Sequence, residues 1–178
     1  MAYVAKTARV FEDAQVCEDA WVSGAAWVCG DARVSGHARV FGAAQVFGDA
    51  QVFGDTRVSG DAQVFGEAQV FGDTRVSGDA RVFGDARVFG DARICYDMLV
   101  ERHLSATRSD GYTFTMAPSA AGGYWITAGC QSFRTLQDAR AHWHATRGGT
   151  PLGEETQAIL DYLERVFAVY YTPEGVKK

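Results

Sequence analysis

A six-residue repeat organises the first half of the chain. From Val4 to Ile94 an aliphatic residue recurs at every sixth position, without an insertion or deletion. Four residues after each aliphatic residue, up to Ala92, stands Ala or, at Thr56 and Thr74, Thr, and Gly followed by Asp closes most of the units. A short period that never slips is the sequence signature of a solenoid.

Each unit combines a short strand with a corner. Because side chains alternate along a strand, the Ala and Val of a unit point to one side, and the Arg or Gln and the Phe or Ser point to the other. The Gly that follows tolerates the positive φ that a tight corner needs. A strand and a corner in every six residues close a triangular coil every eighteen. The repeat therefore predicts a three-sided prism with Ala and Val inside.

The unit Val-Phe-Gly-Asp-Ala-Arg, as at residues 82–87, resembles the hexapeptide repeat of left-handed parallel β-helices. The resemblance covers about the first half of the chain and implies a left-handed parallel β-helix of about five coils. Acyltransferases, γ-type carbonic anhydrases and non-catalytic scaffolds share this prism. The resemblance therefore implies a fold and leaves the activity open.

The repeat ends at Cys95 and Tyr96, and the remaining sequence has a different pattern. We predict a mainly β protein with two domains, the β-helix at 1–97 and a small α+β domain at 98–178. The patterns in the second domain predict strands at 100–107, 112–116 and 124–128, a helix at 136–147 that Thr135 caps, and a second helix at roughly 154–171. Since the last coil of a solenoid exposes strand edges, we expect this domain to cap it.

The three faces of the predicted prism carry different outward side chains. The first face has an arginine ladder, beside a column of mostly small residues, and the second and third faces have phenylalanine ladders. The arginine ladder consists of Arg39, Arg57, Arg75 and Arg93. The phenylalanine ladders consist of Phe47, Phe65 and Phe83 on the second face and Phe53, Phe71 and Phe89 on the third.

The phenylalanine ladders predict an interface. Contiguous apolar strips on a protein surface usually mark contact sites, and burying one ring stabilises a contact by about 1.5–3 kcal/mol. Two different apolar faces suit a contact between the second face of one copy and the third face of the next, closed into a ring of three. We predict a homotrimer with these six Phe residues at the interface. The alternative is that the C-terminal segment folds back over one ladder.

The arginine ladder predicts an anion site. Neighbouring coils lie about 4.8 Å apart, so the four guanidinium groups stack like charges unless an anion lies over them. Phosphate matches the bidentate geometry of arginine. A neighbouring copy that brought an aromatic or Gln column beside this face would complete a nucleotide groove. The alternative is that each Arg pairs with a corner Asp and only keeps the face soluble.

Catalytic and metal-binding candidates are few. His37 is the one histidine of the repeat region, and no loop is inserted there to enclose a substrate, so we interpret it as a corner residue. A γ-type carbonic anhydrase would need three imidazoles around a metal. His142 and His144 lie two apart on a predicted helix and so face different sides. The corner acids fit solvated turns, with calcium as the alternative. We therefore expect no catalytic residue, metal or cofactor.

Composition limits the binding partners and the cellular compartment that we expect for this protein. The formal net charge is -5 and the pI about 5.3, which argues against a protein that coats polymeric nucleic acid or an anionic membrane. Four cysteines without paired metal spacing, and no leader or long apolar run, favour a reduced cytoplasmic protein.

These observations together predict a non-enzymatic homotrimer that sequesters a small anionic ligand. Residues 126–130 and 139–143 also resemble tails of small phage and prophage proteins. That resemblance implies a phage-encoded anti-defence sponge for a nucleotide signal, cyclic or linear, acting in the host cytoplasm. Two alternatives remain: a hexapeptide-repeat acyltransferase that uses an acyl-coenzyme A donor, and a structural phage or scaffold component.

Overall fold

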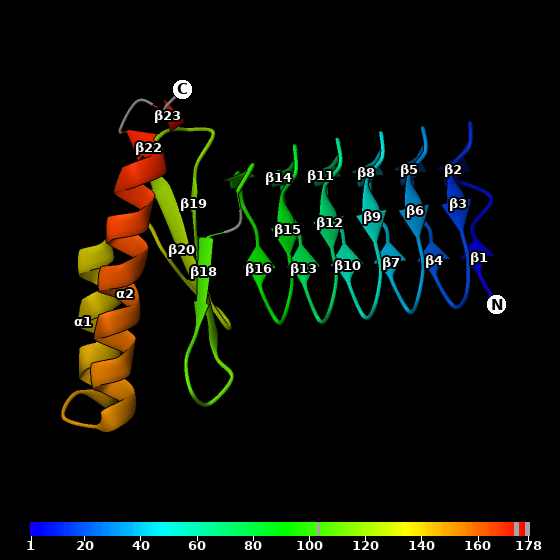
Figure 1. The fold of residues 1–178 in the computed structure, drawn as a ribbon. Coiled ribbons are helices and arrows are strands. Elements are labelled where there is room, and N and C mark those ends of the chain that lie inside the picture. The colour runs from blue at the N-terminus through cyan, green and yellow to red at the C-terminus, as the bar shows by residue number, and fades with distance from the viewer. Residues whose placement is uncertain (103, 173–174, 177–178) are drawn as a thin grey trace. The chain divides into compact units, whose positions relative to one another are not determined.

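A computed structural model describes residues 1–102, 104–172 and 175–176. The chain forms two compact units, Met1–Arg102 and His103–Lys178. The first is a parallel β-solenoid of about five coils, and the second combines an antiparallel sheet with two helices (Figure 1). The predicted mainly β fold, a parallel β-helix followed by a small α+β unit, is confirmed.

Two-residue strands form the three faces of the solenoid. The first face holds β1 (Tyr3–Val4), β4 (Trp21–Val22), β7 (Arg39–Val40), β10 (Arg57–Val58), β13 (Arg75–Val76) and β16 (Arg93–Ile94). The second holds β2 (Arg9–Val10), β5 (Trp27–Val28), β8 (Gln45–Val46), β11 (Gln63–Val64), β14 (Arg81–Val82) and β17 (Leu99–Val100). The third holds β3 (Gln15–Val16), β6 (Arg33–Val34), β9 (Gln51–Val52), β12 (Gln69–Val70) and β15 (Arg87–Val88).

Each strand pairs in parallel with the equivalent strand of the next coil. Arg57, for example, lies opposite Arg39 on one side and Arg75 on the other. The backbone N–H of Arg57 donates to the carbonyl oxygen of Thr74 over 2.9 Å, and the same bond recurs coil after coil. This register places every outward side chain beside its equivalent in the neighbouring coils.

Small and aliphatic side chains fill the interior of the prism. Val40, Val58 and Val76 are fully buried, as are most of the Ala residues of the repeat. Thr56 and Thr74 are also fully buried, and their hydroxyls donate to the carbonyl oxygens of Phe53 and Phe71 over 2.8 and 2.7 Å. Because both hydroxyls have acceptors, they add no unsatisfied polar group to the core.

The corners depend on glycine where coils stack. Gly66 has φ +73°, and a Cβ built on it would lie 3.0 Å from the backbone nitrogen of Gly84 in the next coil. The described corners with a side chain at positive φ are Glu12, Glu18 and Tyr96, all near an end of the repeat. The carboxylate of Glu12 accepts from the backbone N–H of Gly30 in the next coil. A side chain is thus accommodated mainly where the array begins or ends.

The solenoid extends beyond the predicted boundary at residue 97. Leu99–Val100 (β17) pairs with β14 in the repeat register, and the compact unit continues to Arg102. The strand predicted at 100–107 is consequently divided between the units, since β18 covers Leu104–Thr107. Residue 103 lies outside the described residues.

The second unit contains a four-stranded antiparallel sheet in the order β18-β19-β20-β21. Its elements are β18, β19 (Thr113–Pro118), β20 (Tyr124–Ala128), β21 (Gln131–Phe133), α1 (Leu136–Arg147) and α2 (Pro151–Tyr170), followed by the hairpin strands β22 (Tyr171–Thr172) and β23 (Gly175–Val176). The hydroxyl of Thr135 caps α1 as predicted. Helix α2 begins at Pro151, earlier than predicted, because the hydroxyl of Thr150 caps it and Pro fits the first turn.

Large side chains form the core of the second unit, in contrast to the solenoid. Phe114, Trp143 and Leu160 belong to a cluster between the sheet and the two helices. The fully buried guanidinium of Arg108 forms a bidentate ion pair with Asp110 over 2.7 and 2.9 Å. This arginine holds the pKa of the Asp110 carboxyl at about 2. Neither helix, in the part of the chain described, has the length and apolar character needed to cross a bilayer.

Candidate anion-binding site

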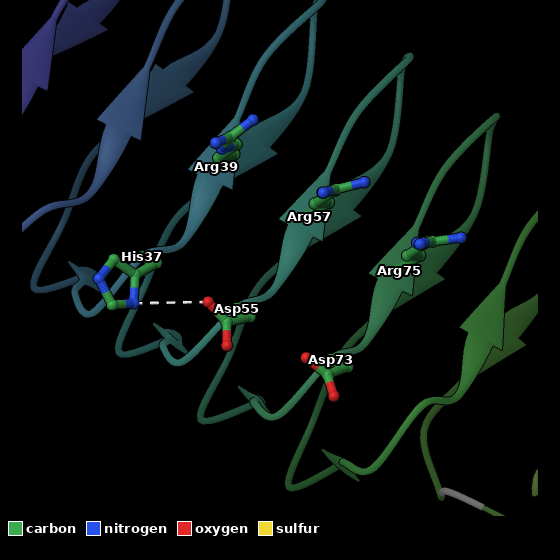
Figure 2. A pocket seen from close by; sticks show the side chains of 6 residues that line it. All are labelled: His37, Arg39, Asp55, Arg57, Asp73 and Arg75. Carbon is green, nitrogen blue, oxygen red and sulfur yellow. Dashed lines mark ion pairs between the residues drawn. The ribbon is translucent and has the colours of Figure 1, made fainter.

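A groove of about 450 Å³ runs across three coils on the first face of the solenoid. Its lining residues, shown in Figure 2, are His37, Arg39, Asp55, Arg57, Asp73 and Arg75. The arginines form one row with one side chain per coil, and His37 and the two aspartates form a second row at the preceding corner. We call this site the arginine groove.

The groove results from the strand register and from the small residues in the column beside the arginines. Strands β7, β10 and β13 place the three arginines side by side. The outward residues two positions after Arg57 and Arg75 are Ser59 and Ser77, whereas the same position on the other faces carries Phe. Small serines leave the long arginine side chains uncovered, whereas stacked rings occupy this column on the other two faces.

The three guanidinium groups form no ion pair in the part of the chain that the structure describes. Within the described residues no carboxylate lies within 4.0 Å of the guanidinium nitrogens of Arg39, Arg57 or Arg75. The ion pairs with corner aspartates that we considered from the sequence are therefore not formed by these three residues. Two unit charges about 4 Å apart in water repel each other by about 1 kcal/mol. An anion laid along the row would replace this repulsion with attraction.

His37 pairs with acids of its own corner column. Its Nδ1 lies 3.4 Å from Oδ1 of Asp55, and its Nε2 lies 3.8 Å from Oδ2 of Asp19. All three side chains are exposed. The amino terminus also binds Asp19, and this hydrogen bond lowers the pKa of the Asp19 carboxyl. The histidine thus occupies a corner position between two acids, and its lack of a catalytic role stays a prediction.

The fourth arginine of the predicted ladder differs from the other three. Arg93 lies in register beside Arg75 on β16, yet it does not line the groove. Its side chain is half-buried, whereas Arg39, Arg57 and Arg75 are exposed. The structure therefore brings together three of the four arginines predicted to bind an anion.

The six phenylalanines predicted at an interface stack in two rows as the register requires. Ring centroids are 4.9 Å apart for Phe47 and Phe65 and 5.5 Å for Phe65 and Phe83 on the second face. On the third face the distances are 4.9 Å for Phe53 and Phe71 and 5.6 Å for Phe71 and Phe89. Stacking leaves five of these rings half-buried, while Phe89 keeps 50% of its surface exposed.

A second cavity on the first face went unnoticed in the sequence. It measures about 320 Å³ and is lined by Trp21, Ser23, Arg39 and Phe41. The rings of Trp21 and Tyr3 lie 4.2 Å apart between centroids. The available signal was that Trp21 immediately precedes the arginines in their column and Phe41 interrupts the column of small residues. We call this cavity the aromatic cavity.

The structure gives no metal-binding arrangement in the part of the chain it describes. There, no group of three His, Cys, Asp or Glu side chains gathers as ligands around one point. The imidazoles of His142 and His144 project from α1, and the ring of His142 packs against Phe133 and Trp143.

The repeat is similar to a known family of solenoids. Residues 32–48 and 80–96 match the family model described as the YdcK beta solenoid repeat. Each matched segment includes one strand from every face, for example β6, β7 and β8 in the first. No curated protein matches the chain. The family match therefore covers the solenoid fold and brings no activity with it.

Proposed function

We propose that this protein is a non-enzymatic binding protein that holds a small anionic ligand, a nucleotide, in the arginine groove. One observation carries the proposal: three exposed guanidinium groups line one groove, and none of them pairs with a carboxylate among the described residues. Two aspartates also line the groove, so the charge of its Arg and Asp side chains is 3 − 2 = +1. A phosphate can accept two parallel N–H bonds from each guanidinium it meets.

The proposed assembly is a homotrimer built through the phenylalanine ladders. The second face of one copy would contact the third face of the next, which covers both rows of rings and leaves the first face for the ligand. Each subunit would then carry one arginine groove. Assembly also hides the apolar strips that a monomer would expose to water.

The biological version of the proposal is sequestration in the cytoplasm of a bacterial host. A protein that binds a nucleotide signal without converting it lowers the free concentration of that signal. The resemblance of residues 126–130 and 139–143 to tails of phage and prophage proteins supports an anti-defence role. The groove supports only the binding step.

Native mass spectrometry of the protein as purified from cells tests this proposal, followed by titration with linear and cyclic nucleotides. We expect a trimer that carries one nucleotide per subunit and releases it unchanged. A monomer would refute the proposed assembly. A trimer that binds no nucleotide and no polyphosphate would refute sequestration, and would favour a structural phage or scaffold component.

A second candidate function is acyl transfer, and the pair of His37 and Asp55 favours it. A carboxylate 3.4 Å from an imidazole can orient that ring as a general base, and the neighbouring arginines could hold the phosphates of coenzyme A. His37 is exposed, however, with 70% of its side chain accessible, so nothing in its own coil excludes water. Transfer of an acetyl group that His37→Ala abolishes would establish this function instead.

A further inference from the structure

The aromatic cavity adjoins the arginine groove, and Arg39 lines both. Trp21 lies opposite Arg39 in the strand register, and Arg39 lies opposite Arg57. One column of the first face therefore changes from aromatic to cationic between adjacent coils, about 4.8 Å apart. A ligand lying along this column would meet rings at one end and guanidinium groups at the other.

Three large side chains and one small one line the aromatic cavity, and the small one is Ser23. Trp21 and Ser23 belong to one coil, and Arg39 and Phe41 occupy the equivalent positions of the next. Ser23 is thus flanked by Trp21 along the chain and by Phe41 across the coils. A planar ring placed over Ser23 would contact both aromatic side chains, and its substituent would reach Arg39.

Phe41 differs from the rings on the other two faces, whereas the ring of Trp21 lies beside that of Tyr3, 4.2 Å away between centroids. On the second and third faces, each phenylalanine of the ladders stacks on another one coil away. Phe41 instead has Ser23 and Ser59 at the equivalent positions, so its ring faces are not covered by the column. Trp21 keeps 47% of its surface exposed, and Phe41 keeps 38%. Exposed rings beside a row of arginines are the combination that binds bases and phosphates in single-stranded nucleic-acid sites.

We propose that the aromatic cavity is a base subsite: the nucleobase of the ligand stacks on Trp21 and Phe41, and its phosphates extend over Arg39 toward Arg57 and Arg75. This inference rests on the proposed function and adds the orientation of the ligand along the solenoid. A phosphate joined to the base through one sugar meets Arg39 first, and further phosphates meet the next arginines in order. The ligand class is a nucleoside polyphosphate.

The test uses isothermal titration calorimetry to measure the affinities of two ligands for the parent protein and for matched variants. ATP carries a base and phosphates, and tripolyphosphate carries phosphates alone. Phe41→Ser introduces the residue that the repeat itself has at Ser59, so it preserves the coil, and Trp27→Ala removes an exposed indole from the second face as a control. GTP, CTP and UTP extend the panel if ATP binds weakly.

We expect Phe41→Ser to weaken the binding of ATP about 10-fold, in line with the loss of one base–aromatic stack, and to leave tripolyphosphate binding unchanged. Trp27→Ala should change neither. Quenching of tryptophan fluorescence by ATP, and its loss in Trp21→Ala, gives a second readout. Equal affinities of Phe41→Ser and the parent protein for all four nucleotides would overturn the base subsite.

The outcomes separate this inference from the proposed function. If tripolyphosphate and the nucleotides bind equally well and both depend on Arg57, the arginine groove stands and the base subsite is wrong. If the parent protein binds neither tripolyphosphate nor any nucleotide, both are wrong. An equal loss of both ligands in Phe41→Ser would mean that the substitution disturbs the groove, which would also refute a separate base subsite.

Discussion

The first face of the solenoid and the other two faces share a backbone and differ in their outward side chains. All three are built from two-residue parallel strands in the same register over the same interior of Ala and Val. The difference lies in two outward positions of the unit. On the first face, Arg and Ser occupy them in successive coils and leave a groove, whereas on the other faces Gln or Arg stands beside Phe and the rings stack.

This difference teaches that in such a solenoid the fold and the surface chemistry are encoded separately. Inward residues and corner glycines determine the prism, and they are nearly the same on each side. Outward residues determine the chemistry of each surface, and the register repeats each of them as a row. The most direct experiments therefore replace an outward residue of one face with the residue that another face carries at the same position of the unit.

Converting the phenylalanine faces to the composition of the first face should have the largest effect. Phe65→Ser combined with Phe71→Ser removes the central ring of each ladder. We expect the variant trimer to dissociate at a protein concentration at least about 100-fold higher than the parent trimer does, because burying each ring contributes about 1.5–3 kcal/mol. Light scattering coupled to gel filtration measures the mass. Phe41→Ser on the first face is the control, and an unchanged trimer in the double variant would disprove the interface.

A substitution at a stacked corner should destabilise the framework that the faces share. Gly66→Ala and Gly84→Ala both place a side chain at positive φ, which costs about 1–2 kcal/mol. Only Gly66→Ala also brings a Cβ to 3.0 Å from a backbone nitrogen, because the Cβ of Gly84→Ala meets Cγ of Glu101 at 3.5 Å. We expect Gly66→Ala to lower stability by at least about 1 kcal/mol more. Thermal unfolding followed by circular dichroism compares them, and equal melting temperatures would contradict the close stacking.

Exchanging one arginine for the glutamine of the other faces should weaken the ligand site. Arg57→Gln introduces the residue found at Gln63 and Gln69, and we expect about a 10-fold loss of affinity for a polyphosphate, since a charged hydrogen bond contributes about 1.5–3 kcal/mol. The effect should shrink at high salt. Arg81→Gln on the second face is the matched control. The same loss in both variants would show that overall charge, and not the groove, attracts the anion.

The smallest effect concerns the two buried hydroxyls beneath the first face. Thr56→Ala restores the residue that this column has at Ala38 and removes the hydrogen bond to the carbonyl oxygen of Phe53. We expect a loss of about 1 kcal/mol in the free energy of unfolding, with unchanged ligand affinity. Thr74→Ala should behave in the same way. If Thr56→Ala alters affinity as much as Arg57→Gln does, the corner also positions the arginine.

The fold was predictable mainly where the sequence repeats. A strict period specifies strand, corner and register together, so the three faces and their rows followed from sorting outward residues. Helix α1 was predicted at its observed bounds because Thr135 and Gly148 mark its ends. Strand β21 was missed because three half-buried residues after a turn show no alternation, and the buried position of Arg108 has no local signature.

The candidate site was predictable in part. The row formed by Arg39, Arg57 and Arg75 follows from the period alone, but the hollow around them depends on the space that the serines leave. Arg93 shares the period but is half-buried, a difference that the repeat pattern does not predict. The aromatic cavity depends on residues that break the pattern, and a search for regularity passes over them.

The stacking register also means that deletions of eighteen residues and of six residues would have different consequences. Removing eighteen residues, for example 49–66, would delete one complete coil and leave every later side chain on its own face, so the row of arginines would become one step shorter. Removing six, for example 49–54, would move every later residue onto the preceding face and put Ser59 at the place of Phe53 in a phenylalanine ladder. Whole coils can therefore be gained or lost to match the length of a ligand, while single units cannot.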